Sequence, residues 1–335
     1  MNRTTCPTQQ RGVALITVLM VVALVAILGT EMVTRLQLQV QRTANIKDAN
    51  QAYWYALGAE QYARKSIGEL LDLSGDKIHL NQPWSQEFVY PLDNGGIQAQ
   101  LVDMQSCFNL NALTFNQEGA EFSTGSQVTA EMEAFQRLLL TPELIPGLDS
   151  YSADVVRDSL ADWLDENDQI RSFGAEDVDY ESLPNPYLAG NAPMQNKTEL
   201  RLVNGVRPEW INALMPLVCA RPNDLAMQIN VNTMTEELAP VLAAVTGLDV
   251  EQARRLIAAR PSDGYDDVTA FLSEPDITAL ELPQDRQQWF SVTTQYFILY
   301  TKTRYNNATF AMSSVFHVDA NKQVTVVRRE FGGRY

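Results

Sequence analysis

The sequence has few histidines and little positive charge. His79 and His317 stand far apart and without metal-ligand spacing, which leaves little material for a histidine-dependent active site or a zinc site. Lysine and arginine number 25 against 41 acidic residues, so the formal net charge is −16. Because nucleic-acid affinity depends mainly on neutralising phosphates with basic side chains, this balance disfavours nucleic acid as a partner. The 335 residues are enough for two domains with their own cores.

Charge is also missing from residues 12–30. The apolar run Val13–Gly29 approaches, at about 1.5 Å per residue, the length needed to cross a bilayer core. A secretory signal peptide would end in a small-residue cleavage site, whereas this run continues without glycine or proline from Thr30 to Leu57, with apolar residues at near-helical intervals. We therefore predict one long helix, half in a membrane and half outside it.

The segment before the apolar run is a short polar and basic leader, MNRTTCPTQQRG. Leader, glycine, aliphatic stretch and amphipathic extension together resemble the class III signal of type IV pilin-like proteins, in which a prepilin peptidase cuts after the glycine. The resemblance implies cleavage between Gly12 and Val13, methylation of Val13 although pilins commonly have phenylalanine there, and an anchor that is kept. An ordinary single-pass membrane anchor is the alternative.

The fifth mature position departs from the pilin pattern. Pilin-like subunits usually carry a glutamate there, which in the family pairs with the new amine of the subunit above, but this chain has Thr17, and its first acid is Glu31. A buried carboxylate without a partner is unfavourable by an amount on the order of several kcal/mol, so a subunit with nothing above it gains nothing from the acid. The missing glutamate indicates the tip of a fibre, although drift in an anchor unrelated to pilins would give the same residue.

The three cysteines fit an exported protein. Cys6 lies in the predicted leader, so the mature chain keeps Cys107 and Cys219. A disulfide between them would close a loop of roughly 110 residues, worth about 4 kcal/mol in the chain-entropy model, and would suit the periplasm. Two buried free thiols are the alternative.

Beyond the first helix the pattern changes twice. Residues 86–111 contain two alternating segments around Asp93-Asn94-Gly95-Gly96, a hairpin signal in which we expect the glycines to supply positive φ. Residues 112–287 are helical in pattern with many turns marked by proline or glycine, and three strand-like runs follow. The predicted fold is α+β: a pilin-like long N-terminal helix packed on a small antiparallel sheet, with a large all-α domain inserted between strands. The predicted boundaries are a leader at 1–12, the helix at 13–72, the first part of the sheet at 73–111, the inserted domain at 112–287 and the last strands at 288–335.

The predicted insertion contains a faint internal repeat. The order Asn-x-Asn, helix, Gly-Leu-Asp, helix begins at Phe108 with FNLNALT and again at Ile229 with INVNTMTEELAPVLAAVTGLDVEQARRLIAAR. The second copy is similar to helix-hairpin-helix or SAM-like modules, which in DNA-binding versions offer backbone N–H groups to phosphate. Asp149 and Asp249 would repel phosphate and instead fit the N-caps of the helices that follow. We therefore expect a structural use of both copies.

The densest charge lies in residues 154–181, where ten acids accompany two arginines. Three aspartates share one helix face by their spacing and two more oxygen-bearing side chains follow as the helix ends: Asp158, Asp162, Asp165, Asn167 and Asp168. Oxygen ligands without histidine or cysteine suit calcium, although the EF-hand order is absent. A solvated acidic surface is the alternative, and a carboxylate pair for glycoside hydrolysis is a third interpretation.

Nearly the whole chain resembles the K-type minor pseudopilins of type II secretion systems. The resemblance rests on RGVALITVL, CFNLNAL, DWLDEND, GAED, NAPMQNKTELRLVNG and INVNT. It implies a pilin-like sheet interrupted by a helical domain, a disulfide, and a calcium site in the acidic segment. The candidate calcium ligands are Asp162, Asp165, Asn167, Asp168, Glu176 and Asp177.

The same resemblance implies partners and a location. It places the chain at a pseudopilus tip with the I-type and J-type minor pseudopilins in a ternary complex, above the major pseudopilin and after cleavage by the prepilin peptidase. It also implies a single-pass anchor in the bacterial inner membrane, with the globular part in the periplasm.

The expected function is assembly and not catalysis. The protein would nucleate and cap a short periplasmic pseudopilus that helps push folded proteins through an outer-membrane channel. The alternative is a membrane-anchored periplasmic hydrolase that uses the acidic segment. A processed N-terminus at Val13 without hydrolytic activity would favour the first function, and carboxylate-dependent turnover by an intact anchored chain would favour the second.

Overall fold

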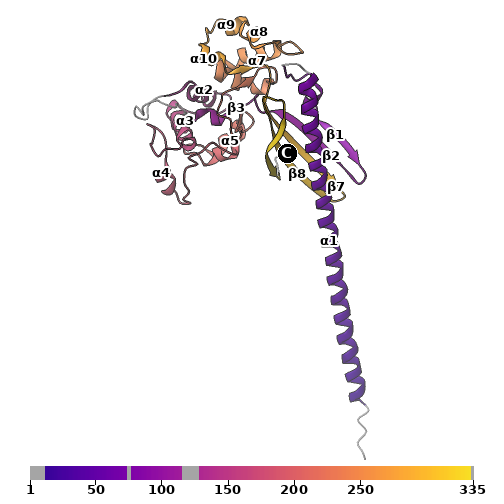
Figure 1. Cartoon of the computed structure of the whole chain (residues 1–335). Helices are drawn as coiled ribbons and strands as arrows, with labels where there is room; N and C mark the ends of the chain where they lie inside the picture. Colours follow the sequence, from indigo (N-terminus) through magenta and orange to yellow (C-terminus); the bar gives the residue numbers. More distant parts are fainter. Residues whose placement is uncertain (1–11, 74–76, 115–127, 333–335) are drawn as a thin grey trace, which may run out of the picture.

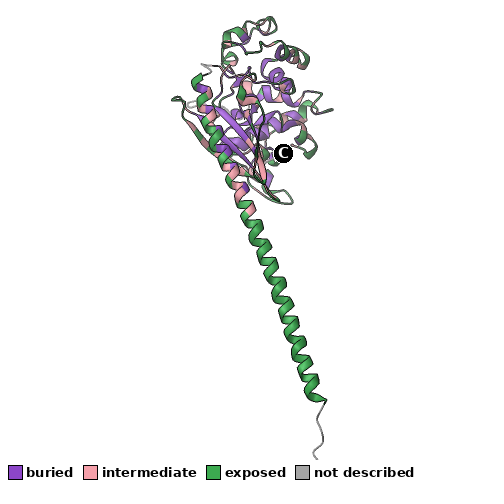
Figure 2. Ribbon diagram, turned by 90° about the vertical axis from the view of Figure 1, so that its right-hand side faces the viewer, coloured by how far each residue is buried: buried purple, intermediate pink, exposed green. Residues whose placement is uncertain are grey.

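The computed structural model describes residues 12–73, 77–114 and 128–332. Helix α1 runs from Val13 to Leu73 and projects far beyond the globular part (Figure 1). Its N-terminal part is exposed on all sides, and its C-terminal part lies against a sheet (Figure 2). In the part of the chain that the structure describes, α1 is the one helix long and apolar enough to cross a membrane.

The threonines in and just after the apolar stretch do not interrupt α1, because their hydroxyls bond within the helix. Thr17 Oγ1 donates to the carbonyl of Ala14 at 2.9 Å, and Thr30 Oγ1 donates to the carbonyl of Ile27 at 2.8 Å. A hydroxyl that bonds the preceding turn needs no external partner. The residue at the fifth position after Gly12 is therefore satisfied by the helix itself.

Five antiparallel strands form the sheet that packs on α1, in the order β1-β2-β7-β8-β9. They are β1 (Phe88–Leu92), β2 (Gly95–Asp103), β7 (Tyr296–Tyr305), β8 (Ala308–Val318) and β9 (Val324–Phe331). Asp103 pairs with Phe297, so the chain leaves the sheet at the end of β2 and returns beside it on β7. The predicted long N-terminal helix and small antiparallel sheet are confirmed.

The turn between β1 and β2 differs from the prediction. Asn94 has φ 65°, and neither Gly95 nor Gly96 is among the described residues with positive φ. Gly95 is required for another reason, because a Cβ there would lie 1.9 Å from the carbonyl oxygen of Arg304 on β7. The expectation that glycine supplies the left-handed residue was wrong: asparagine tolerates that conformation, and the glycine permits a close backbone approach.

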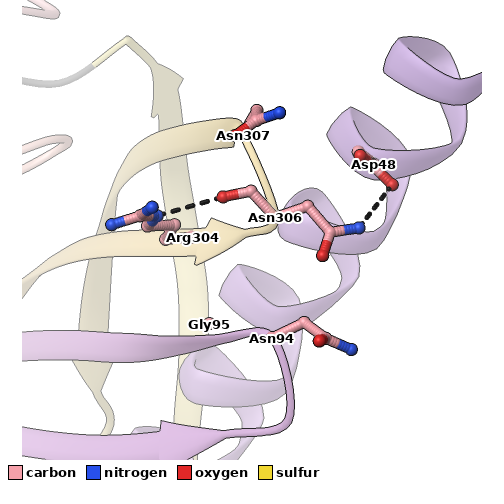
Figure 3. A pocket seen from close by; sticks show the side chains of 6 residues that line it. All are labelled: Asp48, Asn94, Gly95, Arg304, Asn306 and Asn307. Carbon is pink, nitrogen blue, oxygen red and sulfur yellow. Dashed lines mark hydrogen bonds between the residues drawn. The ribbon is translucent and has the colours of Figure 1, made fainter.

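The β1–β2 and β7–β8 turns line an open polar pocket beside α1 (Figure 3). The N–H of Asn306 donates to the carbonyl of Asn94 at 2.7 Å, and its side-chain Nδ2 donates to Asp48 Oδ1 at 3.1 Å. Arg304 Nε donates to the carbonyl of Asn306 at 3.0 Å. These bonds join the end of the sheet to the point where α1 leaves it.

Small residues let α1 lie close to the sheet. The helix buries a stripe at three- and four-residue spacing that consists of Ala52, Ala56, Ala59, Ala63, Ile67 and Leu71. Thr303 Oγ1 on β7 donates to the carbonyl of Ala52 at 2.7 Å, which requires this short separation. Above the alanines, Ile67 and Leu71 pack with Phe297 and Phe316 in the core between helix and sheet.

Glu60 fixes α1 to two strands. Its carboxylate is fully buried and accepts hydrogen bonds from Arg329 Nε at 2.5 Å, Arg329 Nη2 at 2.8 Å and Ser314 Oγ at 2.7 Å. Burial alone would raise the pKa of Glu60, but the hydrogen bonds from Arg329 and Ser314 and the charge of Arg329 lower it. A bidentate arginine–carboxylate pair is both strong and specific in direction.

Replacing Arg329 with methionine is expected to destabilise the protein by about 2 to 4 kcal/mol, because it leaves a buried charge without compensation. The expected loss is smaller than for a fully buried ion pair, because the Arg329 side chain is 43% exposed. Chemical denaturation of the full chain in detergent measures the loss. The double variant Glu60→Gln, Arg329→Met should recover much of it, and a loss no larger in the single variant than in the double variant would contradict a role for the pair.

The insertion fills residues 104–295 and forms two groups of helices beside the sheet (Figure 1). Its α-helices are α2 (Ala130–Leu139), α3 (Ser150–Leu164), α4 (Asp177–Glu181), α5 (Pro208–Leu214), α6 (Ala239–Thr246), α7 (Val250–Ala259), α8 (Val268–Leu272), α9 (Pro275–Thr278) and α10 (Gln284–Gln287). The 3₁₀ turns are η1 (Pro83–Ser85) before β1, and η2 (Leu110–Leu113), η3 (Lys197–Leu202) and η4 (Glu236–Leu238) within the insertion. The largest hydrophobic core of the protein lies among these helices.

The insertion is not all-α as predicted. Strand β3 (Phe108–Asn109) pairs in parallel with β4 (Val218–Cys219), and β5 (Ile229–Asn230) pairs in parallel with β6 (Phe290–Ser291). Two residues are too few to show an alternating pattern, and for this reason the sequence did not reveal these strands. Residues 108–109, predicted to belong to the pilin-like sheet, pair with the insertion instead.

The two copies of the internal repeat use the second asparagine of Asn-x-Asn in the same way. Asn111 donates from Nδ2 to the carbonyl of Met194 at 3.0 Å and accepts from its N–H at 2.8 Å. Asn232 makes the same pair of bonds with Tyr265, at 3.0 and 2.7 Å. Each asparagine thus satisfies both backbone groups of a distant residue, which supports a structural use of the repeat.

The aspartates that follow the Gly-Leu pairs cap helices, as predicted. Asp149 Oδ1 accepts from the N–H of Ser152 at 2.8 Å at the start of α3, and Asp249 Oδ1 accepts from the N–H of Gln252 at 2.7 Å at the start of α7. Gly147 and Gly247 have φ values of 79° and 94°. This left-handed conformation ends the turn or helix before each Gly-Leu-Asp sequence.

The predicted disulfide between Cys107 and Cys219 is present, with its Cα atoms 5.9 Å apart. It joins the residue before β3 to the end of β4, next to Tyr296 and Val315 of the sheet. The bond therefore fastens the insertion at the point where the chain leaves β2, and in the chain-entropy model a loop of this size is worth about 4 to 5 kcal/mol.

Candidate metal centre

The acidic segment folds back over the end of α3. The N–H of Arg171 donates to Asp162 Oδ2 at 3.1 Å, and the N–H of Phe173 donates to Asp158 Oδ2 at 3.3 Å. Residues 165–176 thus cross the aspartates of α3 before α4 begins at Asp177. Four acids of the segment are therefore buried, namely Asp158, Asp162, Asp165 and Glu176, whereas Glu166 and Asp168 stay exposed to solvent.

Gly174 leaves the space in which the Asp162 carboxylate lies. A Cβ at position 174 would be 1.8 Å from Asp162 Oδ2 and 3.2 Å from Cβ of Arg171. The glycine of the GAED motif therefore has a steric role that sequence analysis missed. A glycine separated from an acidic pair by one alanine was the available signal.

Asp162 and Glu176 carry buried oxygens without hydrogen bonds. Asp162 is 0% exposed and Glu176 is 2% exposed. In the described residues, Asp162 Oδ1 and both carboxylate oxygens of Glu176 accept no hydrogen bond of normal geometry, although Asp162 Oδ1 lies 3.6 Å from Arg171 Nε and the Glu176 side chain faces the backbone N–H of Asp179 in a capping box at the start of α4. Most buried polar atoms in proteins are bonded, so three such oxygens on two neighbouring acids call for a cation or another donor.

The electrostatics of the two acids favour the same conclusion. Burial raises the pKa of Asp162 to about 7, and the charges of Asp165 and Asp158 add to the effect. Burial also raises the pKa of Glu176 to about 8, with further increases from the four nearby charges of Asp162, Asp165, Asp168 and Asp177. A divalent cation would remove both causes, because it neutralises the carboxylates and replaces their lost hydration.

The other predicted ligands differ in whether their oxygens already accept hydrogen bonds and in how exposed they are. Asp165 ends α3 and accepts bonds at Oδ1 from the N–H of Asn167 at 3.1 Å and from its Nδ2 at 2.6 Å. Asn167 Oδ1 accepts from the N–H of Gln169 at 2.9 Å, and Asp177 Oδ1 accepts from the N–H of Ala189 at 2.8 Å. Asp168 is exposed. Asp165 therefore keeps Oδ2 for an ion, and Asp168 is open to solvent.

The six predicted residues share one neighbourhood but do not form a complete ligand shell. Across the described ranges, no group of three or more His, Cys, Asp or Glu side chains is already arranged to hold a metal ion. Asp158, predicted to lie on the same helix face, is paired with Arg157 Nε at 2.8 Å and is not available. Asp154, three residues before Arg157, pairs with the same arginine at 2.7 Å. The three-residue spacing of Asp154 and Arg157 on one helix could have indicated this ion pair from the sequence.

The donor atoms fit calcium better than other metals. Carboxylate oxygens, an amide oxygen and loop carbonyls are the ligands that calcium takes, in flexible sets of six to eight. Among the described residues around Asp162 there is no histidine or cysteine of the kind that zinc prefers. The three oxygens of Asp162 and Glu176 without hydrogen bonds are the core of the candidate site.

The raised pKa values predict how the calcium-free protein responds to pH. Asp162 and Glu176 bind protons more readily when folded than when unfolded, so their contribution to folding stability increases as the pH falls from about 8 toward 5. With saturating calcium this contribution should reverse in sign, because protons compete with the ion for the carboxylates. Thermal unfolding of the full chain in detergent, with chelator or with calcium, measures both trends.

The control for this experiment is the double variant Asp162→Asn, Glu176→Gln. It is needed because burial lowers the pKa of His79 in the folded protein. His79 therefore lowers the folding stability as the pH falls from about 8 toward 5, which opposes the effect of the two acids. The difference between wild type and variant isolates the two acids. A difference that does not change between pH 8 and 5.5 would contradict the raised pKa values.

Comparison with known proteins gives two matches to family models, both described as "Type II secretion system (T2SS), protein K". They cover residues 106–223 and 229–293. Both matched ranges lie in the insertion, and the first contains the acidic segment with Asp162 and Glu176.

Curated relatives match over nearly the full length. The chain is 36% identical over 330 residues to the type II secretion system protein K of Klebsiella pneumoniae, covering 97% of each chain. It is 32% identical over 332 residues to the protein of the same name from Aeromonas hydrophila, covering 97% of this chain and 98% of the relative.

One solved structure is similar over most of the chain. It is described as "The Crystal Structure of the GspK-GspI-GspJ complex from enterotoxigenic Escherichia coli Type 2 Secretion System". The similar chain has a TM-score of 0.77 and 28% sequence identity, and the match covers 88% of this chain and 100% of that chain.

Proposed function

The chain belongs to the type II secretion system protein K family, and from this premise we propose that it is the minor pseudopilin that caps and nucleates a pseudopilus tip. In this function it supports the export of folded proteins across the outer membrane and has no catalytic activity. The observation that carries the proposal is the insertion between β2 and β7, at residues 104–295, on a pilin-like helix and sheet. An insertion of that size is too large to repeat along a thin shaft, but it can be placed at the end of a shaft.

The partners follow from the solved relative. The chain similar to this protein was solved in a complex of GspK, GspI and GspJ, and we propose that this chain binds the corresponding I-type and J-type pseudopilins in a 1:1:1 complex. The major pseudopilin would lie below that complex. Thr17 fits such a position, because a tip subunit has no neighbour above it to pair with a glutamate.

Helix α1 supplies the anchor in this proposal. Residues 13–29 cross the bacterial inner membrane once, after the prepilin peptidase has cut between Gly12 and Val13 and Val13 has been methylated, and the globular part lies in the periplasm. Between the apolar stretch and the globular part, α1 carries four apolar residues that are 59 to 75% exposed: Met32, Leu36, Val40 and Ile46. An apolar helix surface with no packing partner is unfavourable in water. This supports the packing of neighbouring subunits' helices along this stretch.

We propose that calcium binds at the candidate metal centre. Asp162, Asp165 and Glu176 would provide carboxylate oxygens, with Asn167, Asp168 and Asp177 in the same neighbourhood. The ion would supply charge neutralisation and would hold residues 165–176 on the end of α3. The hydrolase alternative gains no support, since Asp162 and Glu176 are buried under a loop where a polymer substrate has no access. We also propose that the two Asn-x-Asn units are structural helix-hairpin-helix or SAM-like modules.

Co-purification tests the function. The processed full chain, expressed with the I-type and J-type pseudopilins of the same cell and extracted in detergent, should elute with both at equal stoichiometry, and without them it should stay monomeric. A chain that polymerises alone, or that binds neither smaller pseudopilin, would contradict the proposal.

A further inference from the structure

A fully buried arginine holds the linker between the two groups of helices. This linker, residues 222–228, lies between β4 and β5 and contains the boundary between the two ranges that match the family models. Arg221, directly before it, is 0% exposed. Its Nη1 donates to the carbonyl of Gln228 at 2.9 Å, its Nη2 donates to the carbonyl of Ala226, and its Nε lies 2.9 Å from Asp224 Oδ2. One side chain therefore contacts three residues of the linker.

Asn109 on β3 holds the same linker from another strand. Its Nδ2 donates to the carbonyl of Asp224 at 2.9 Å and to that of Ala226 at 3.2 Å. Its Oδ1 accepts from the N–H of Arg221 at 3.2 Å, and the residue is 0% exposed. Backbone carbonyls in irregular structure need donors from outside a regular ladder, and Asn109 and Arg221 supply them together.

The disulfide lies at a fixed distance along the chain from both side chains. Cys107 comes two residues before Asn109, and Cys219 comes two residues before Arg221. Strands β3 and β4 pair only through Phe108 with Val218 and through Asn109 with Cys219. Because so short a ladder is marginal by itself, the disulfide is what fixes β3 against β4 next to the linker.

The sheet contacts the linker at the same place. The hydroxyl of Tyr296 on β7 donates to the carbonyl of Pro222 at 3.1 Å, and its ring centroid lies 5.9 Å from the guanidinium carbon of Arg221. Tyr296 also packs in one hydrophobic cluster with Cys219. A change in the position of β4 is thus passed on to the contacts that hold the linker against the sheet.

We propose that the Cys107–Cys219 disulfide is a latch for the linker. With the bond present, Asn109 and Arg221 keep residues 222–228 closed, and without it the linker opens while the helices on both sides stay folded. Those helices have separate support, because they share the largest core of the protein and Arg137 Nε of α2 donates to the carbonyl of Ala244 on α6 at 2.8 Å. An open linker is an extended segment that endoproteases can cut, so chains without the disulfide would be removed selectively.

Limited proteolysis of the full chain in detergent, at constant calcium concentration, tests the latch. Chymotrypsin can cut after Leu225 in the linker and after Leu188, which is 56% exposed between α4 and η3 and is the internal control. In the double variant Cys107→Ala, Cys219→Ala, cutting after Leu225 should be about tenfold faster, because local opening limits the rate. Cutting after Leu188 should stay within about twofold of wild type. Both cysteines precede Leu225, so the two fragments separate with or without the disulfide, and mass spectrometry identifies them.

A second variant tests whether the latch acts through Arg221. Arg221→Lys keeps the charge but loses the planar fork that reaches several acceptors, so cutting after Leu225 should be about fivefold faster with the disulfide intact. Combining it with the two cysteine substitutions should add less than about twofold, because both changes open the same linker. The matched control Arg254→Lys, at an arginine paired with Glu251 and Glu143, should leave the rate unchanged.

The wild-type chain provides a measurement that does not depend on how a variant folds. A water-soluble phosphine reduces the disulfide to two thiols and becomes the phosphine oxide, with its oxygen taken from water. The reduced chain should be cut after Leu225 as fast as the double cysteine variant. An unchanged rate after Leu225 would overturn the latch, and so would equal acceleration after Leu225 and Leu188, which would show general loosening. A slow Arg221→Lys variant beside a fast cysteine variant would also overturn it.

Discussion

Replacing Gly12 with leucine is expected to leave the full-length precursor in the membrane and to abolish secretion. Helix α1 begins at Val13, directly after Gly12, and the N–H of Ile16 donates to the Gly12 carbonyl at 3.4 Å. The bond that we propose is cut therefore lies at the helix start, where a peptidase needs an extended and unobstructed backbone, and a glycine provides it. N-terminal sequencing and gel migration of the membrane-extracted protein measure the processing.

The matched control adds the same bulk at another glycine of α1. A Cβ at Gly58 would meet nothing within 4 Å, so Gly58→Leu should be processed like wild type. A mature protein of unchanged size from the Gly12→Leu variant would contradict the pilin-like signal. A precursor that accumulates in both variants would show that the effect is not specific to the predicted site.

Chelation is expected to destabilise the native protein, and Asp162→Ala is expected to remove that response. An ion that binds the folded state stabilises it by RT ln(1 + [L]/Kd), which is about 2.7 kcal/mol at a hundredfold excess over Kd. Asp162 has a buried oxygen without a hydrogen bond in the described chain, so its loss would remove a ligand from the proposed site. Melting of the full chain in detergent, with calcium or with chelator, measures the difference.

Asp158→Asn is the control for that experiment. It changes a carboxylate on the same helix that is already paired with Arg157, so it should lower stability and still respond to calcium. Equal melting with calcium and chelator in the wild-type protein would contradict the proposed calcium site and leave an acidic segment without an ion.

Local patterns were sufficient to predict the scaffold. The long helix follows from an apolar run that continues without glycine or proline, and the β1–β2 hairpin follows from alternation on both sides of Asp93–Asn94. The capping roles of Asp149 and Asp249 also depend on residues three positions away. In each case the interacting groups are close in sequence, where spacing is informative.

Long-range polar networks were not predictable in the same way. Asp103 ends β2 and is buried, and it accepts hydrogen bonds from Thr233 Oγ1 at 2.6 Å and from Asn230 Nδ2 at 2.9 Å. Burial raises the pKa of Asp103, while these bonds oppose the increase. The partners lie 127 and 130 residues away, so nothing in the spacing of the sequence indicates that they meet. The contact between Arg171 and Asp162 was missed because it depends on the path of the covering loop.

Cysteine cross-linking in assembled pseudopili distinguishes the proposed position of this chain at the tip from a position along the shaft. Single cysteines at Leu36 and Val40, which are 59% and 63% exposed on α1, would report the neighbours of the helix. The native pair Cys107 and Cys219 is already in a disulfide. We predict cross-links to the two smaller minor pseudopilins in single copies and none between copies of this chain. A regular series of self-cross-links along the shaft would contradict the tip position.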